Sequence, residues 1–214
     1  MIKMRLKNST KRLKKYKINI KLTKKNIFIF LISFLIISFI CGIIFYFYLN
    51  SSDKDTINKN IGNYFILKDS YNYVNLFFKS SFNNIINSSI IWLLGISVIG
   101  IVVVLFMFFS SFFSLGFSMS AIIGLYGAKG IGGLLCYLLF SRCLFLVNIF
   151  ILTFFSINIS IKIFKICFLK DEINIKEEIR KYYKILILSL CISVICSILE
   201  IFVDPFMIKL FNLI

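Results

Sequence analysis

The sequence predicts an all-α, polytopic integral membrane protein with about five transmembrane helices. Three observations support this fold class: 59% of the 214 residues are hydrophobic, the mean hydropathy is +0.93, and the chain contains a single proline. Soluble globular domains are much less apolar than this. The charged residues lie almost wholly outside the apolar runs. We therefore expect lipid, and not water, to surround most of the chain.

The formal charge of +16 is distributed in two basic blocks. Residues 1–26 hold eleven Lys or Arg and no acidic residue, and residues 162–184 hold seven basic residues against four acidic ones. Cytoplasmic segments next to transmembrane helices carry such an excess of Lys and Arg. We therefore predict that 1–26 is a cytoplasmic tail that is attracted to anionic lipid. This placement argues against a nucleic-acid partner, although a specific contact of the tail with nucleic acid or protein is the alternative.

The first transmembrane helix is predicted at 27–49. Its 23 residues can cross the hydrocarbon core and exceed the apolar core of a signal peptide, so we expect an uncleaved anchor. Residues 50–84 follow as an outer loop, which is too short to bury a core of its own. From Ser70 onward, apolar residues recur at helical spacing, and this pattern predicts an interfacial helix that leads into the next span.

A transmembrane hairpin is predicted in the longest uncharged stretch, which covers the 49 residues 80–128. About 20 helical residues cross a bilayer, so this stretch is too long for one span and suits two, with arms at 90–109 and 112–126. Residues four apart share one face of a helix, and small residues there let a neighbouring helix approach closely. The second arm has three such residues: Gly116, Ser120 and Gly124.

The fourth span is predicted at 143–161. Before it, residues 127–133 form a glycine-rich turn at the membrane surface, without the preceding strand that a phosphate-binding loop requires. The apolar run that follows this turn is too long for one upright helix. We therefore expect 134–140 to be a short extra piece that is either re-entrant or lies at the interface.

The last span is predicted at 185–203, after an inner loop at 162–184. An outer loop at 50–84 and an inner loop at 162–184 require an odd number of crossings between them, and the three predicted spans satisfy this. The N-terminus is then cytoplasmic and the C-terminus lies outside. Residues 27–214 form a single transmembrane helical domain.

The last span carries a second face of small residues and one carboxylate. Glu200 continues this face about 24 Å along the helix from Lys184. This places it near the outer boundary of the membrane, at the depth that we also estimate for Arg142. Ionisable groups at such depth usually pair, so we hypothesise that Arg142 and Glu200 are partners. The alternative is that each side chain extends to the lipid head groups. The small residues, again four apart, are Ser189, Ser193 and Ser197.

The residue inventory argues against an enzyme or a metal site. The chain has no histidine, which is the commonest general base and metal ligand. Its six cysteines lie in or beside apolar segments, and none forms a Cys-x-x-Cys pair. Glu200 and Asp204 lie one helical turn apart, but no second acidic motif accompanies them. We therefore expect no catalytic residues, no cofactor and no small-molecule substrate.

Three short motifs, in a fixed order, carry a resemblance to a known family. They are the nonapeptide WLLGISVIG from Trp92 to Gly100, then Leu115-Gly116-Phe117 with the later turn Lys129-Gly130, and finally Leu199-Glu200 with Asp204-Pro205. The length, the basic N-terminus, the first anchor and the outer loop agree as well. On these grounds, and over essentially its whole length, the chain resembles the stage II sporulation protein M family.

This resemblance implies a non-enzymatic role in engulfment, when the mother-cell membrane migrates around the forespore. The implied partners are the stage II sporulation proteins D and P, which degrade peptidoglycan and would be positioned at the septal membrane. We hypothesise that the faces around Gly116 and Ser189 and the loop at 50–84 contact these partners. A small permease or channel subunit is the alternative, because an uncharged hairpin with glycine-broken helices is typical of transport sites.

Overall fold

The computed structural model describes residues 24–70, 73–137, 142–169 and 175–210, and it confirms the all-α fold class. Over these ranges the chain forms helices joined by short connections, and no strand occurs. Residues 1–23 of the predicted basic tail, 1–26, lie outside the described residues, and Lys24 to Asn26 form the start of α1. The helices are α1 (Lys24–Tyr48), α2 (Ser51–Ser70), α3 (Tyr73–Gly95), α4 (Gly100–Tyr137), α5 (Cys143–Leu169) and α6 (Ile175–Leu210).

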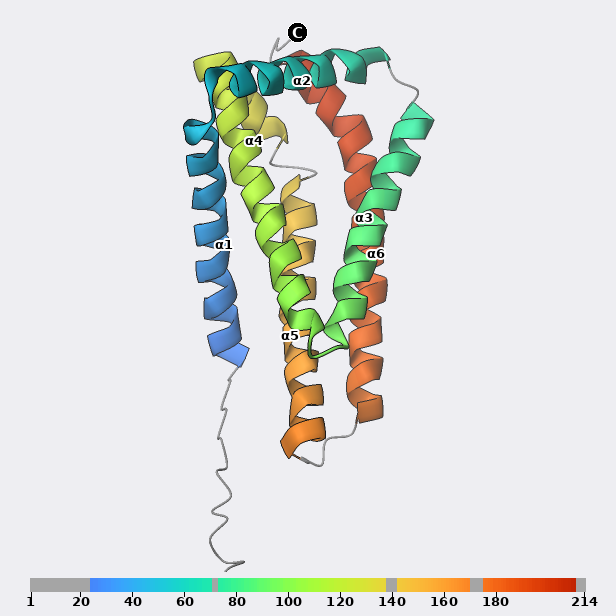
Figure 1. Cartoon of the computed structure of the whole chain (residues 1–214). Coiled ribbons are helices and arrows are strands. Elements are labelled where there is room, and N and C mark those ends of the chain that lie inside the picture. Colours follow the sequence, from blue (N-terminus) through green and yellow to red (C-terminus); the bar gives the residue numbers. More distant parts are fainter. Residues whose placement is uncertain (1–23, 71–72, 138–141, 170–174, 211–214) are drawn as a thin grey trace, which may run out of the picture.

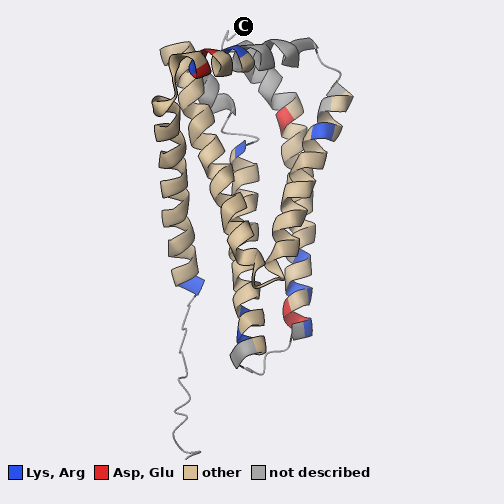
Figure 2. Ribbon diagram, viewed as in Figure 1, with Lys and Arg blue, Asp and Glu red and all other residues tan. Residues whose placement is uncertain are grey.

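The helices form a bundle with one helix laid across its end (Figure 1). α1, α3, α4, α5 and α6 run roughly along one axis, while α2 crosses the end at which α6 finishes. α1 packs mainly against α4, and α3 packs against α6 and α5. Figure 2 shows that the charged residues of the described ranges lie toward the two ends of the bundle, with an uncharged stretch of ribbon between them.

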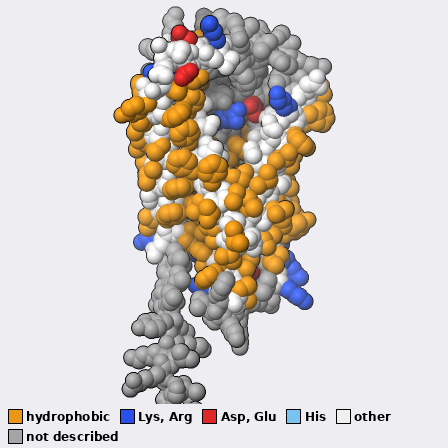
Figure 3. Space-filling view, in the orientation of Figure 1, with side chains coloured by type: hydrophobic (Ala, Val, Ile, Leu, Met, Phe, Trp, Pro, Cys, Tyr) orange, Lys and Arg blue, Asp and Glu red, His pale blue; other side chains and the backbone are white. Residues whose placement is uncertain are grey.

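Within the described ranges, four helices are long and apolar enough to cross a membrane: Lys24–Tyr48, Gly100–Gly127, Cys143–Cys167 and Lys176–Ile201. Hydrophobic side chains cover the face seen in Figure 3 between the ends of the bundle, as expected for a surface in contact with lipid. The predicted spans 27–49, 143–161 and 185–203 lie almost wholly within three of these helices. α3 is not among the four, because Lys79 and several Asn and Ser residues lower its hydropathy.

The two predicted arms of the hairpin, 90–109 and 112–126, are wrong. α3 ends at Gly95 and α4 begins at Gly100, so the chain turns within residues 96–99. α4 then continues through Ser110 and Ser111 without a break. Ser111 Oγ donates a hydrogen bond to the Met107 carbonyl oxygen at 2.8 Å, four residues back, which satisfies the hydroxyl inside an apolar helix.

Both predicted loops contain more helix than we expected. The predicted outer loop, 50–84, holds α2 and the first half of α3. α3 then continues without a break into the start of the predicted arm 90–109 and ends at Gly95. The inner segment 162–184 holds the end of α5 and the start of α6. Ion pairs support these ends, because Lys162 contacts Glu178 and Lys181 contacts Glu177.

The glycine-rich segment at 127–133 is a kink within α4. Gly127 has a φ of 58° and a ψ of −136°, a conformation that disfavours residues with a Cβ. The chain is helical again from there to Tyr137. The predicted extra piece at 134–140 therefore begins as helix, and its last residues, 138–140, lie outside the described residues.

Candidate functional site

A row of polar side chains follows one face of α3. Ser80, Asn84, Ser88 and Trp92 are spaced four residues apart, so they lie one above another on the helix. This face is turned toward α6 and α5. We call this row and its partners the polar seam. Its contacts fall into an upper part near α2, a middle part, and a lower part near the turn at 96–99.

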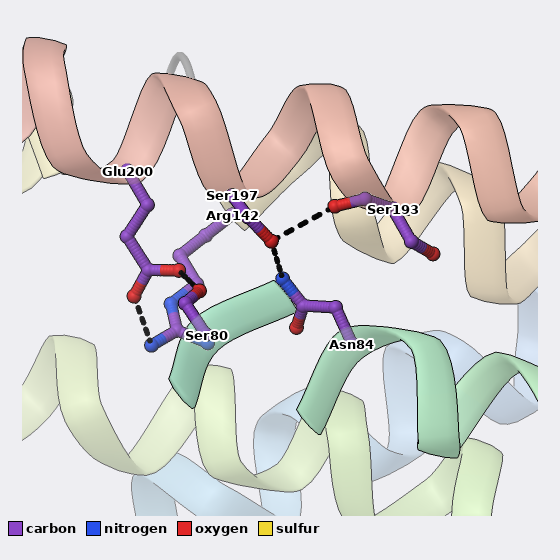
Figure 4. A network of polar contacts seen from close by, with 6 residues as sticks. All are labelled: Ser80, Asn84, Arg142, Ser193, Ser197 and Glu200. Carbon is purple, nitrogen blue, oxygen red and sulfur yellow. Dashed lines mark hydrogen bonds and ion pairs between the residues drawn. The ribbon is translucent and has the colours of Figure 1, made fainter. Parts of the chain in front are cut away.

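The upper part of the polar seam holds an ion pair (Figure 4). Arg142 donates a hydrogen bond to Glu200 Oε1 at 3.3 Å, and Ser80 Oγ donates to the other carboxylate oxygen. The Glu200 side chain is 13% exposed and that of Arg142 is 38% exposed. The structure thus brings together the two residues that the sequence suggested as partners, with Ser80 as a third participant.

The middle part is an uncharged hydrogen-bond network. Asn84 Nδ2 donates to Ser197 Oγ at 3.0 Å, and the hydroxyls of Ser88 and Ser193 lie 2.9 Å apart. From α5, Asn148 Nδ2 reaches three acceptors: Ser189 O and Ser193 Oγ at 3.2 Å each, and Ser88 Oγ at 3.4 Å. Four of these side chains, those of Ser88, Asn148, Ser193 and Ser197, are at most 2% exposed. The network therefore fastens α3 to both α5 and α6 away from solvent.

The lower part of the seam fixes the end of α3. Trp92 Nε1 donates to the Tyr182 carbonyl oxygen at 3.2 Å, and the Tyr182 hydroxyl donates to the Trp92 carbonyl oxygen at 2.9 Å. The two rings stack with centroids 5.4 Å apart. Ser160 donates to the carbonyl oxygens of Gly95 and Ser97, the latter at 3.2 Å. The carbonyl groups of Trp92 and Gly95 belong to the last turn of α3, where the end of a helix leaves carbonyl groups without intrahelical partners.

The small-residue face of α4 packs against α1. A Cβ added at Gly116 would overlap the Phe39 carbonyl oxygen, and one added at Gly42 would overlap the Phe113 carbonyl oxygen. Ser120 is buried and donates to the Gly116 carbonyl oxygen at 3.0 Å. Gly124 makes room for the Tyr46 side chain. This face therefore serves contact within the chain.

The residues that the sequence singled out on the last span also lie inside the bundle. Ser189, Ser193 and Ser197 are each at most 3% exposed. The hydroxyls of Ser193 and Ser197 contact polar side chains of α3, whereas Ser189 offers its backbone carbonyl oxygen to Asn148. Sequence reasoning missed the matching row on α3 and Asn148. The spacing of four between Ser80, Asn84, Ser88 and Trp92 was the available signal for that row.

A cavity of about 400 Å³ lies among α3, α4 and α5, beside the ion pair. Part of its described lining is apolar, and the rest is polar. Figure 3 shows polar and charged side chains set back between α4 and α3, on the side where α2 crosses the bundle. The polar residues are Asn87, Ser110, Ser111, Ser114, Ser118 and Arg142.

The described residues provide packing and hydrogen bonding, and we identify no catalytic constellation among them. Over those ranges, no three His, Cys, Asp or Glu residues lie close enough to hold a metal ion. The carboxylate of Glu200 is engaged by Arg142 and Ser80. The polar seam is therefore best understood as a set of contacts that hold helices together in an apolar environment.

Replacing Asn148 with alanine is expected to lower the free energy of unfolding by about 2 kcal/mol. Hydrogen bonds between transmembrane helices contribute about 0.6 kcal/mol on average and rarely more than about 1.7, and Asn148 makes three contacts. Unfolding of the purified protein in detergent measures the change. The matched control is Asn158→Ala on the same helix, because Asn158 Nδ2 donates to the Phe154 carbonyl oxygen of its own helix. Equal effects of the two substitutions would contradict this account of the seam.

Comparison with known proteins identifies the family. No curated protein and no solved structure shows significant similarity to this chain. The family model described as stage II sporulation protein M matches residues 27–205, a range that begins in α1 and ends in α6. The match includes the polar seam and the cavity. The chain therefore belongs to the stage II sporulation protein M family, and it is a sporulation protein with membrane-spanning helices.

Proposed function

We propose that the protein is a non-enzymatic membrane scaffold that positions peptidoglycan-degrading partners at the septal membrane during forespore engulfment. The observation that carries this proposal is the family match over residues 27–205. It is supported by an apolar bundle in which the polar seam forms its hydrogen bonds within the chain. Such a bundle offers a rigid anchor and no described catalytic set. The expected partners are the stage II sporulation proteins D and P.

We propose that α3 is a fifth crossing, which places the N-terminus in the cytoplasm and the C-terminus outside. α3 runs from the α2 end of the bundle to the turn at 96–99 (Figure 1), and the polar seam turns Ser80, Asn84 and Ser88 of α3 toward α5 and α6. Polar groups in hydrocarbon need such partners. The net basic ends of α5 and α6 suit the cytoplasmic side.

The partner surface that we propose is α2. The small-residue faces around Gly116 and Ser189 are occupied within the chain, so they are not free for a partner. The part of α2 whose side chains the structure describes, residues 51–60, is mostly exposed and carries Asp53 and Asp55. α2 lies across the end of the bundle that would face the peptidoglycan.

Co-purification from sporulating cells tests the scaffold. The stage II sporulation proteins D and P are expected to be recovered with the tagged wild-type chain. Asp53→Lys combined with Asp55→Lys is expected to reduce recovery at least tenfold without lowering accumulation of the chain. Glu177→Lys, at the other end of the bundle, is the control. Failure of the wild-type chain to recover either protein would refute the proposed partners, and full recovery by the Asp53/Asp55 variant would refute the surface.

The cavity of about 400 Å³ favours one alternative, a permease or channel subunit. Polar cavities beside interrupted helices occur at transport sites, and here α4, which lines the cavity, is kinked at Gly127. Purified protein in liposomes distinguishes the two functions. The scaffold predicts no protein-dependent flux of ions or small solutes, whereas a flux that filling the cavity abolishes would support transport.

A further inference from the structure

A second row of polar side chains follows α3 beside the polar seam and points away from it. Asn75, Lys79, Asn83 and Asn87 are spaced four residues apart, so they lie one above another on the helix. All four residues are exposed. Within the described part of the chain, none of the four forms a hydrogen bond or an ion pair. The row therefore presents unpaired polar groups at the surface of the bundle.

Serine residues of α4 face the same space. Ser110, Ser114 and Ser118, again four apart, line the cavity of about 400 Å³ together with Asn87 of α3. Counting about 1.5 Å per residue from the helix ends at the turn 96–99, Asn87 lies about 12 Å along α3 and Ser110 about 15 Å along α4. The two rows thus match in depth. We call the polar hollow between them, visible in Figure 3, the lateral groove.

The lateral groove lies inside the hydrocarbon when α3 crosses the membrane, and the inference rests on that proposed crossing. Lys79 is next to Ser80, which donates a hydrogen bond to Glu200, and we estimate the depth of Glu200 near the outer boundary. Asn83 and Asn87 lie one and two turns deeper. An amide at that depth has no water to bind, so it needs a partner that offers hydrogen bonds.

The depth of the groove selects a helix over a lipid. Asn87 lies about 12 Å along α3 from Lys79, where lipids offer acyl carbons and no polar group. A polypeptide that reaches this depth is helical, and its side chains four residues apart repeat the spacing of both rows. Arg142 is already held by Glu200, so the amides and hydroxyls set the chemistry of the groove.

The charge of Lys79 argues against a second copy of this chain as the occupant. In a two-fold symmetric dimer within one membrane, Lys79 of one copy would face Lys79 of the other at the same depth, and like charges repel. A helix with a carboxylate at that level pairs with Lys79 instead. We propose that the lateral groove binds a transmembrane helix of another protein, with a carboxylate at the level of Lys79 and amide or hydroxyl side chains one and two turns deeper.

Synthetic transmembrane peptides test the groove of the full chain in phosphatidylcholine liposomes. The first peptide is a leucine helix with glutamate at its outer end and asparagine four and eight residues deeper. The second has lysine in place of the glutamate, and the third has leucine at all three positions. Energy transfer between labelled protein and labelled peptide measures association.

We expect the glutamate peptide to associate about tenfold more strongly than the leucine peptide, a difference of about 1.4 kcal/mol. The factor is modest because hydrogen bonds between transmembrane helices are individually weak. The lysine peptide is expected to associate more weakly than the glutamate peptide. Equal association of the glutamate and leucine peptides would overturn the proposal.

Two variants of the chain test the residues. Lys79→Glu is expected to reverse the preference, so that the lysine peptide associates more strongly than the glutamate peptide. Asn83→Leu combined with Asn87→Leu is expected to lower association of the glutamate peptide about tenfold. The control is Ser33→Leu, at an exposed position of α1, which is expected to change nothing. An unchanged preference in the Lys79→Glu chain would overturn the proposal, as would wild-type association in a folded Asn83/Asn87 variant.

Energy transfer between two labelled copies of the chain tests the rival occupant. We expect no transfer that depends on Asn83 and Asn87. Transfer that the Asn83/Asn87 variant abolishes would assign the lateral groove to a second copy and overturn the proposal. The peptide assay uses neither the stage II sporulation proteins D and P nor the α2 surface. Its failure would therefore leave the co-purification result standing, and failed co-purification would leave the groove standing.

Discussion

Gly116→Leu is expected to separate α1 from α4 and to lower the free energy of unfolding by about 3 kcal/mol. The side chain would be built into the Phe39 carbonyl oxygen, which belongs to the backbone of α1 and cannot rotate away. Gly42 makes the reciprocal approach to the Phe113 carbonyl oxygen. Because a Cβ alone already overlaps, Gly116→Ala is expected to be destabilising as well.

Thermal unfolding in detergent, together with the amount of folded protein recovered from membranes, measures this effect. The control is Cys191→Leu, because Cys191 is exposed on α6 and a larger side chain there faces lipid. The control is expected to unfold within a degree or two of the wild type. A stable Gly116→Leu protein with an unchanged unfolding midpoint would show that α1 and α4 do not pack as described.

Glu200→Arg is expected to lower the accumulation of the protein several-fold, and Arg142→Glu in the same chain is expected to restore it. Removing one partner of a buried ion pair costs about 3–5 kcal/mol. Because Arg142 is 38% exposed, we expect loss of the pair to lower the free energy of unfolding by about 2 kcal/mol. Repulsion between Arg142 and the arginine introduced at position 200 adds to this loss. A change of about 1–2 kcal/mol is enough to alter abundance several-fold in cells.

The exposed pair of Lys181 and Glu177 provides the matched control for this reversal. Its nitrogen and oxygen are 2.7 Å apart, but both side chains are 61% exposed. Solvent screens such a pair, so it contributes little to the free energy of unfolding. Glu177→Arg is therefore expected to leave accumulation nearly unchanged. If the chain with both Glu200→Arg and Arg142→Glu accumulated no better than the chain with Glu200→Arg alone, the two residues would not be acting as a pair.

The features set by length and charge could be predicted from the sequence. Three apolar runs of about 20 residues between charged ends specify α1, α5 and α6, because crossing a bilayer fixes both the length and the composition of a helix. The proximity of Arg142 and Glu200 followed from a depth count of about 1.5 Å per residue. These inferences need no knowledge of which helices are neighbours.

The features set by packing could not be predicted in this way. The predicted arms 90–109 and 112–126 placed the turn at Ser110 and Ser111, but a serine in an apolar helix can satisfy its hydroxyl on the carbonyl four residues back, as Ser111 does. The turn lies instead between Gly95 and Gly100. The buried polar face of α3 could not be recognised, because its partners on α5 and α6 are 60 or more residues away in the chain.

The proposed topology of five crossings requires α3 to cross the membrane and to place its polar face against α5 and α6. With α3 as a fifth crossing the two termini lie on opposite sides, and with the four apolar helices alone they lie on the same side. Reporters fused to each terminus, whose signal depends on the compartment, distinguish these cases in one measurement. We expect a cytoplasmic signal from the N-terminus and an external signal from the C-terminus. The same compartment for both termini would contradict the account.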